Sequence, residues 1–320
     1  MEKPAIEGGT PVRETPIFYG HQYIDEADIQ AVEEVMKSDY LTCGPKIGEL
    51  EKKLCDVTGA KYAVVCANGT AALHIAALCA GVGEGDEVIT TPITFAASAN
   101  CALYCGARPV FADIDPETYN IDPAKVEAAI TPRTKAVVAV DYTGQSVELG
   151  PIRESCKKHG LVLIEDGAHV IGTTYKGRPN GSIADMTTFS FHPVKTVTGG
   201  EGGAVLTNDE ILYKKLLLYR AHGITREEKL MEHEPDGPWY YEQISLGYNY
   251  RITDMQAALI ISQLDKLPMF SARRKEIVKR YDEAFRKMPE LFVQREIPES
   301  DTTRHLYILR IVPELSLIHI

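Results

Sequence analysis

The sequence has no apolar run of the roughly 18 residues that a membrane helix needs, and its charged N-terminus lacks the apolar stretch of a signal peptide. Lys and Arg do not cluster into a stripe, and 34 basic against 45 acidic residues give a formal net charge of −11. These absences argue against a membrane protein and against a protein that grips nucleic acid through its phosphates. We therefore predict a cytoplasmic protein with neither membrane nor nucleic acid as a partner.

C-x-x-C pairs are missing as well, and the seven cysteines are an odd number in mostly apolar surroundings. Free thiols in a reducing compartment explain this pattern better than a disulfide framework does. We predict that the cysteines fill the core, and we predict no metal site. The cysteines are Cys43, Cys55, Cys66, Cys79, Cys101, Cys105 and Cys156.

The composition is that of an ordinary globular protein, with 44% hydrophobic and 25% charged residues, and the length suits one large domain and a smaller one. Short apolar runs rich in β-branched residues alternate with helical patterns, which is typical of an α/β fold with a mainly parallel sheet and helices on both faces. The seven expected strands are Tyr62–Cys66, Glu87–Thr90, Pro109–Asp113, Ala136–Asp141, Val162–Asp166, Met186–Phe191 and Ala204–Thr207.

Helical patterns precede the strands, separate them and follow them. After Thr253 the helical period returns, and Pro268 is expected to end that helix. We predict a large domain with an N-terminal helical segment over residues 1–250 and an incomplete small domain over residues 251–320. The other expected helices are Asp25–Lys37, Lys46–Thr58, Thr70–Ala80, Ala96–Cys105, Asp122–Ile130, Val147–His159 and Ala272–Lys287.

Lys195 follows Asp166, the last residue of an apolar strand, by 29 residues. The pair suits pyridoxal 5'-phosphate, because an aldehyde cofactor needs an amine to bond with and its ring nitrogen needs a carboxylate that keeps it protonated. Each residue alone has an ordinary explanation. A lysine in a polar turn is usually a solvated charge, and an Asp at a strand end often caps the next turn.

The segment after the first strand, Asn68-Gly69-Thr70, leads through a small-residue turn into a helix. A phosphate fits such a place, because Gly69 lets the backbone approach, Thr70 offers a hydroxyl and the first N–H groups of the helix point at the anion. An Asn-Gly turn with a threonine cap is the plain alternative. In a doubly wound sheet the ligand lies at the carboxyl ends of the strands, where Asp166 and Ser190 also fall.

Three further residues fit a cofactor site. Phe95 follows a strand end, where its ring can lie on the pyridine face, but a core position at a helix start suits it equally well. Ser190, five residues before Lys195, can offer a hydroxyl to the phosphate. His169, three residues past Asp166, either donates to the phenolic oxygen of the cofactor or orients the carboxylate.

Taken in order, these motifs closely resemble the DegT/DnrJ/EryC1/StrS family of sugar aminotransferases. The resemblance rests on the turn at Gly69, on Phe95, and on the segments Glu165-Asp-Gly-Ala-His169, Phe189-Ser-Phe-His-Pro-Val-Lys195 and Gly247-Tyr-Asn-Tyr-Arg251. It implies the aspartate aminotransferase fold, fold type I, with pyridoxal 5'-phosphate as the cofactor. Within the family, the sequence is most similar to the transaminases of pseudaminic acid biosynthesis.

The resemblance also implies an activity. L-glutamate gives its amino group to the cofactor, Lys195 acts as the base, and the acceptor is the C4 keto group of a UDP-linked 6-deoxy-N-acetyl hexulose. Related sugar dehydratases have His where Lys195 stands, so the lysine favours transamination. Family members are homodimers, and Asn249 matches the residue that crosses to the cofactor phosphate of the neighbouring subunit. Arg220, His222 and Arg251 are weaker candidates for binding the donor or the sugar nucleotide.

Two other interpretations stay open. The acceptor is another keto nucleotide sugar, or the protein is a non-catalytic binder of pyridoxal phosphate. Family chains usually continue well past a segment such as His305-Leu-Tyr307, whereas this one stops at residues 315–320, which resemble none of that region. On this ground we expect a truncated small domain.

Overall fold

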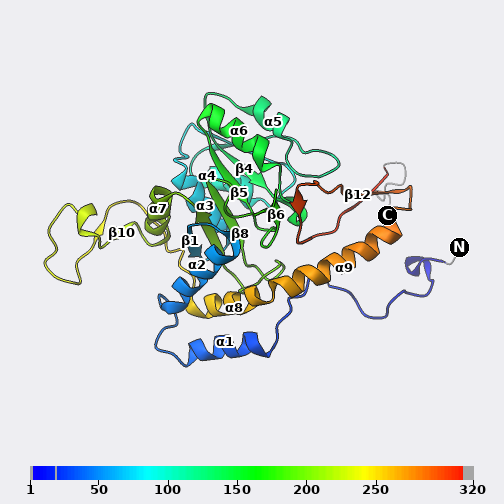
Figure 1. Cartoon of the computed structure of the whole chain (residues 1–320), viewed down its shortest axis with the longest axis horizontal. Coiled ribbons are helices and arrows are strands. Elements are labelled where there is room, and N and C mark those ends of the chain that lie inside the picture. Colours follow the sequence, from blue (N-terminus) through cyan, green and yellow to red (C-terminus); the bar gives the residue numbers. More distant parts are fainter. Residues whose placement is uncertain (1–2, 19, 313–320) are drawn as a thin grey trace.

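The centre of the molecule is a seven-stranded sheet with helices on both faces (Figure 1). The computed structural model describes residues 3–18 and 20–312, so the residues 315–320 considered above lie outside it. The strands are β1 (Tyr62–Cys66), β2 (Glu87–Thr90), β3 (Arg108–Phe111), β4 (Thr134–Val140), β5 (Val162–Asp166), β8 (Met186–Ser190) and β9 (Gly203–Thr207). Their order is β1-β9-β8-β5-β4-β2-β3, and only β9 runs against the common direction of the other six.

Both faces of the sheet are buried, because successive side chains of a strand point to opposite sides. In β4, Val138 packs into the core on one face, whereas Val137 and Ala139 pack on the other. In β1, Val64 and Val65 divide in the same way. This double burial explains why the strands read as continuous apolar runs in the sequence.

The helices form two outer layers that share their cores with the sheet. One layer contains α3 (Gly69–Cys79), α4 (Ala97–Tyr104) and α7 (Glu210–Arg220). The opposite layer contains α2 (Pro45–Thr58), α5 (Pro123–Ala129), α6 (Leu149–His159) and α8 (Asp254–Asp265), with α1 (Glu26–Met36) against α8. Short 3-10 helices cover Ala5–Glu7, Tyr142–Gly144 and Glu228–Leu230.

Each of the seven strands begins and ends within two residues of its predicted bounds, and so do the predicted helices up to residue 159. The expectation that Pro268 ends α8 is wrong. Helix α8 ends at Asp265, and Pro268 lies in the first turn of α9 (Leu267–Phe285), where a missing N–H costs nothing. Helix α7 is not predicted from the sequence.

An arm and a C-terminal segment extend from the body of the molecule, as does the N-terminal chain (Figure 1). The arm carries β10 (Ile224–Thr225) paired with β11 (Glu242–Gln243). The C-terminal segment is α9 with β12 (Leu291–Val293) and β14 (Leu309–Ile311). The C-terminal chain returns to the body through β13 (Ser300–Asp301), which pairs with β6 (Thr174–Tyr175), itself paired with β7 (Arg178–Pro179). The division into domains at residue 250 stays a prediction.

All seven cysteines are free, and Cys66, Cys79, Cys101 and Cys156 are buried as expected. Cys43 is exposed, so the expectation that every cysteine fills the core is wrong for this residue. Within the described part of the chain, no helix combines the length and the hydropathy that crossing a membrane requires.

Candidate active site

Four strands that run in the same direction end at one edge of the sheet. There β1 leads into the turn before α3, β2 into the loop that carries Phe95, β5 ends at Asp166, and β8 leads to Lys195. A cavity of about 440 Å³ opens at this edge. Seven of the eight predicted site residues line it, namely Gly69, Thr70, Phe95, Asp166, His169, Ser190 and Lys195.

Lys195 lies in a loop that follows β8 and is fixed by backbone hydrogen bonds. Its N–H donates to the carbonyl of His192 at 2.9 Å, and the N–H of Phe191 donates to the carbonyl of Gly202 at 2.8 Å. Burial lowers the pKa of the Lys195 amine, and the nearby Asp166 carboxylate opposes this change. Across the described residues, no group forms a hydrogen bond or an ion pair with the amine. The amine is therefore available to a ligand, and its partial burial does not fit the alternative of a solvated surface lysine.

Asp166 ends β5 with its side chain 5% exposed. Burial raises the pKa of this carboxyl group, while hydrogen bonds from Ser98 and from the backbone of Ala168, together with the charge of Lys195, act in the opposite direction. The Ser98 hydroxyl donates to Oδ2 at 2.7 Å, and the Ala168 N–H lies 3.3 Å from Oδ1. Sequence analysis missed Ser98, whose only signal is its place in the helix that follows Phe95.

The turn between β1 and α3 is tightly packed against the end of β8. A Cβ atom on Gly69 would lie 2.9 Å from the Cβ of Ser190, so only glycine fits here. The helix cap is Asn68, whose side chain accepts from the N–H of Ala71 at 2.9 Å. The alternative of a threonine cap is therefore wrong, and Thr70 keeps its hydroxyl for the cavity that it lines.

Phe95 is 76% exposed, which rules out the alternative of a core phenylalanine. The ring stands at the wall of the cavity, between the loop after β2 and the start of α4. An aromatic side chain left open beside buried polar groups is suited to stacking on a flat ligand.

His169 follows β5 and packs against His305, with the ring centroids 4.4 Å apart. Burial, and then the proximity of His305 and Lys195, lowers the pKa of His169 to about 2, so the ring is neutral at pH 7. Its Nδ1 is buried and has no hydrogen-bond partner among the residues described here. The role of holding the Asp166 carboxylate therefore has no support, whereas an open nitrogen suits a ligand. Sequence analysis missed His305, which no local pattern marks.

Asn249 does not line this cavity. Its backbone pairs with Ala221 at the base of the arm, and its side chain is exposed. Arg220 is also engaged elsewhere, because its guanidinium group donates to Glu51 at 2.6 Å and to the carbonyl of Val65 at 3.0 Å. Arg220 is therefore a poor candidate for binding a substrate carboxylate.

The donor set of the cavity fits pyridoxal phosphate. It combines an amine without a partner at Lys195, a buried carboxylate at Asp166 and a helix N-terminus flanked by hydroxyl groups. The buried Nδ1 of His169 without a partner and the glycine-only approach at Gly69 mark a space shaped for a ligand.

Most of this chain is similar in sequence to known proteins. It is 44% identical over 293 residues to the spore coat polysaccharide biosynthesis protein SpsC of Bacillus subtilis. This alignment covers 92% of this chain and 75% of that protein. The chain is 41% identical over 301 residues to the UDP-4-amino-4,6-dideoxy-N-acetyl-beta-L-altrosamine transaminase of Campylobacter jejuni, which covers 93% and 77%. The chain thus spans about three quarters of the length of these relatives.

Solved structures agree with these relatives. PseC of Helicobacter pylori, an aminotransferase involved in the biosynthesis of pseudoaminic acid, superimposes with a TM-score of 0.86 at 36% identity, covering 94% of this chain and 79% of that one. The PLP form of Spr1654 from Streptococcus pneumoniae has a TM-score of 0.86 at 33% identity, covering 93% and 79%, and a PMP form is equally similar. The family model for the DegT/DnrJ/EryC1/StrS aminotransferases matches residues 22–316. The chain therefore belongs to the DegT/DnrJ/EryC1/StrS aminotransferase family, which confirms the predicted resemblance and the predicted fold type.

Proposed function

We propose that this pyridoxal phosphate-dependent aminotransferase moves the amino group of L-glutamate to the C4 keto group of a UDP-linked 6-deoxy-N-acetyl hexulose. The observation that carries the proposal is the amine of Lys195, which has no partner within residues 3–18 and 20–312 and belongs to a residue that lines the same cavity as Asp166. When bound, the cofactor supplies an electron sink for the carbon that loses its proton. The relatives named for the altrosamine transaminase and for pseudoaminic acid biosynthesis support this choice of sugar.

The proposed roles follow from the environment of each side chain. Because burial lowers its pKa, the Lys195 amine gives up its proton more readily than a solvated lysine does, and its Nζ would then accept a proton from the α-carbon of the donor. Asp166, held by Ser98, would place a negative charge beside the ring nitrogen of the cofactor. Gly69, Thr70 and Ser190 would hold the phosphate. Phe95 would stack on the ring, and His169 would offer its free nitrogen to the phenolic oxygen.

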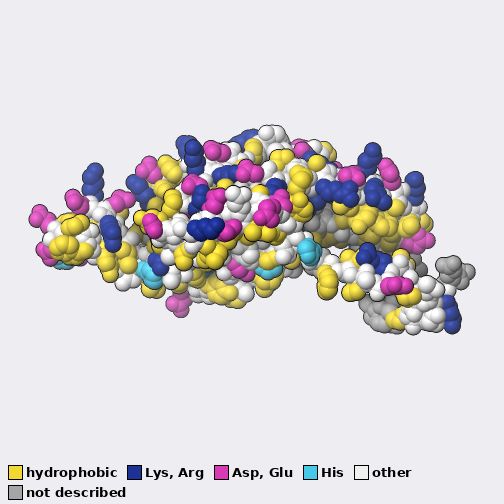
Figure 2. Space-filling model, turned by 90° about the horizontal axis from the view of Figure 1, so that it is seen from below, with side chains coloured by type: hydrophobic (Ala, Val, Ile, Leu, Met, Phe, Trp, Pro, Cys, Tyr) yellow, Lys and Arg dark blue, Asp and Glu magenta, His cyan; other side chains and the backbone are white. Residues whose placement is uncertain are grey.

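We propose a homodimer in which Asn249 reaches the cofactor phosphate of the partner. Two features support it. Asn249 is exposed and outside the cavity of its own chain. The neighbouring arm exposes Trp239, Tyr241, Ile244 and Leu246, and hydrophobic side chains gather at its end in Figure 2. Apolar surface of this kind is typical of a subunit interface. We further propose a cytoplasmic location.

A second acceptor has specific support. The chain is 40% identical over 264 residues to the GDP-perosamine synthase of Caulobacter vibrioides, which covers 82% of this chain and 68% of that protein. Aminotransferases for different nucleotide sugars are thus similarly close to this sequence. A keto sugar linked to GDP is therefore the alternative to the UDP-linked hexulose.

A labelled amino donor tests the proposal. The purified protein, loaded with pyridoxal phosphate, is given ¹⁵N-labelled L-glutamate and a panel of UDP- and GDP-linked 4-keto sugars, and the products are analysed by mass spectrometry. We expect the label at C4 of the UDP-linked 6-deoxy-N-acetyl hexulose. Transfer only to the GDP-linked sugar would replace the acceptor. If no sugar receives the label and the absorbance of the cofactor does not change on adding L-glutamate, a non-catalytic binding protein is favoured.

A further inference from the structure

A second cavity, of about 310 Å³, lies on the other side of Lys195. Val194 and Lys195 line both cavities, so the loop after β8 forms the wall between them. The rings of His169 and His305 continue this wall, because His169 lines the first cavity, His305 lines the second, and the rings are in contact. A molecule in the second cavity would therefore contact the loop that carries Lys195.

The second cavity contains two cationic side chains. Among the residues that the structure describes, no Asp or Glu lines it, whereas Lys195 and Arg274 do, together with the rings of His21 and His305. The pKa of His305 is lowered to about 3, mainly by burial and then by the positive charges of Lys195 and Arg274. Both cations therefore lie near this ring. Two aromatic residues, Tyr23 and Phe270, also line the cavity, and their rings pack edge to face with centroids 5.8 Å apart.

Arg274 is the unusual group in this cavity. It is half-buried, burial lowers its pKa, and throughout residues 3–18 and 20–312 nothing forms an ion pair or hydrogen bond with its guanidinium group. Its neighbour Arg273 is exposed and pairs with Glu276 at 2.6 Å. A guanidinium group keeps its charge at any ordinary pH, so partial burial without a counter-ion is costly unless an anion binds.

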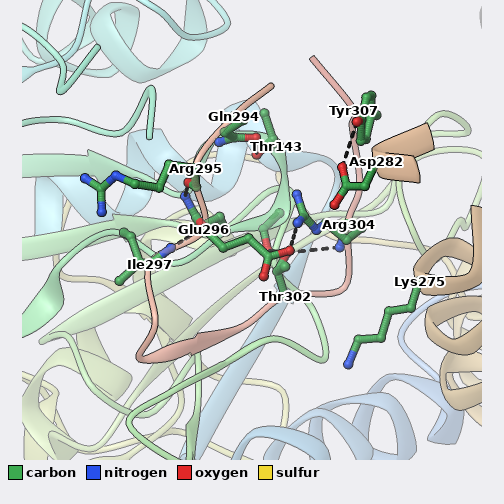
Figure 3. Close-up of polar contacts among 12 residues, drawn as sticks. Thr143, Lys275, Asp282, Gln294, Arg295, Glu296, Ile297, Thr302, Arg304 and Tyr307 are labelled. Atoms are coloured by element: carbon green, nitrogen blue, oxygen red, sulfur yellow. Dashed lines mark hydrogen bonds and ion pairs between the residues drawn. The ribbon is translucent and has the colours of Figure 1, made fainter. Parts of the chain in front are cut away.

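Other cations near the C-terminal chain already have partners. Figure 3 shows Arg304 directed at Glu296, and Tyr307 donating to Asp282 at 2.7 Å. Lys275, one residue after Arg274, pairs with Asp301 at 2.5 Å. The two cations adjacent to Arg274 in the sequence, Arg273 and Lys275, are thus paired, whereas Arg274 is paired with no residue that the structure describes.

We propose that this second cavity binds a carboxylate of the amino donor, with Arg274 as the anchoring residue. The inference rests on the proposed function and deepens it. An amino donor must bring its α-carbon to the Lys195 amine, and the α-carboxylate is bonded to that carbon. In a nucleotide sugar, the phosphates are separated from the C4 keto group by the sugar ring. An unpaired guanidinium group in a cavity that contains Lys195 therefore suits the carboxylate better than the diphosphate, and Arg binds carboxylates through two parallel hydrogen bonds.

Two measurements on the holoenzyme test this assignment. The first is calorimetric binding of glutarate, a dicarboxylate that has no amino group and cannot react. The second is the concentration dependence with which L-glutamate changes the absorbance of the cofactor in a single turnover. Arg274→Met should weaken both by about 10- to 100-fold, because a hydrogen bond to a charged group is lost. Arg274→Lys should recover part of the loss, and Arg273→Met, the matched control, should behave as wild type.

The outcomes separate this inference from the proposed function. If the wild type shows no response to L-glutamate, the proposed function fails before Arg274 is tested. If the wild type responds and Arg274→Met and Arg274→Lys bind glutarate and L-glutamate normally, the carboxylate site is refuted. If the KM of the sugar nucleotide rises while donor binding stays normal, Arg274 serves the acceptor and the assignment is wrong. Should Arg274→Met not fold, Arg274→Lys decides, because loss of the bidentate geometry must still weaken glutarate binding.

Discussion

The two ends of the central sheet differ in whether their polar and charged side chains have partners. At the amino end, the Glu87 side chain is 1% exposed and its oxygens accept hydrogen bonds from Arg108 at 2.6 Å, from Arg133 at 2.7 Å and from Thr131 at 2.7 Å. At the carboxyl end, the Lys195 amine and the Nδ1 of His169 have no such partner among the described residues.

This difference separates stability from function. Paired buried charges hold an end of the sheet in place, whereas polar groups that are removed from water without partners cost free energy that only a ligand offsets. Parallel strands bring their carboxyl ends to one edge, so the unpaired groups collect there. Perturbed groups gathered in a cavity are typical of an active site. Changes at the carboxyl end should therefore reduce turnover, and changes at the amino end should reduce stability.

Lys195→Ala should have the largest effect. Removing the amine removes both the anchor for the cofactor and the base, so we expect ¹⁵N transfer from L-glutamate to fall at least about a thousandfold, near the upper range for a general base. Lys135→Ala, a change on β4 away from the cavity, is the control and should retain turnover. Borohydride reduction followed by peptide mapping should find the cofactor on Lys195 in wild type. Near-normal transfer by Lys195→Ala would contradict the assignment.

Asp166→Asn should have the second largest effect on turnover. The amide keeps the shape of the side chain but removes the negative charge, and we expect kcat to fall about a hundred- to a thousandfold while the cofactor stays bound. Asp185→Asn is the matched control at the amino end of β8, where the carboxylate accepts from the N–H of Leu163 at 2.8 Å. Absorbance reports the bound cofactor, and product analysis reports kcat. If kcat falls equally in Asp166→Asn and Asp185→Asn, the contrast between the two ends of the sheet is contradicted.

The strand-end residues of the site could be predicted from the sequence because their signals are local. Gly69, Asp166 and Lys195 each lie at, or within a few residues of, the end of an apolar strand, and the parallel direction of those strands accounts for their meeting. The seven strands were predictable for the same reason, since burial on both faces leaves a continuous apolar run. Helix α7 was missed, although Leu212, Tyr213, Leu216 and Leu217 recur at helical spacing and pack against one face of the sheet.

Ser98, Arg274 and His305 could not be predicted, because their roles depend on contacts between distant segments. Ser98 meets Asp166 across 68 residues of sequence, once α4 has packed on the sheet. His305 reaches His169 only because the chain returns to the body after α9. Arg274 lies in a helix full of charges, and only the structure shows that it is half-buried and has no partner among the described residues, whereas the adjacent Arg273 and Lys275 are paired. Sequence spacing contains none of this information.

Ser98→Ala should have a smaller effect at the carboxyl end. Without the hydroxyl group, the pKa of Asp166 should rise further, since the hydrogen bond from Ser98 lowers it. Asp166 must be ionised to act, so the acidic limb of the pH profile of kcat/KM should move to higher pH, with a loss of less than about tenfold at pH 7. An unchanged profile would show that Ser98 does not tune the carboxylate. The same profile for Thr131→Ala, at the opposite end, should match wild type.

Glu87→Gln should leave turnover nearly unchanged and reduce stability, by about 1–2 kcal/mol at pH 7, because two exposed arginines lose a buried partner. Hydrogen bonds from Thr131, then Arg133 and Arg108, lower the pKa of Glu87 to about 2. The unfolded chain therefore takes up this proton first, so the stabilisation is complete above about pH 4.5 and is lost as the pH falls towards 2. Urea denaturation at pH 7 and pH 3 should show the gap between wild type and variant narrowing in acid. Glu84→Gln, at an exposed glutamate three residues away, should be as stable as wild type at either pH. If the stability difference between wild type and Glu87→Gln does not depend on pH, Glu87 acts through packing.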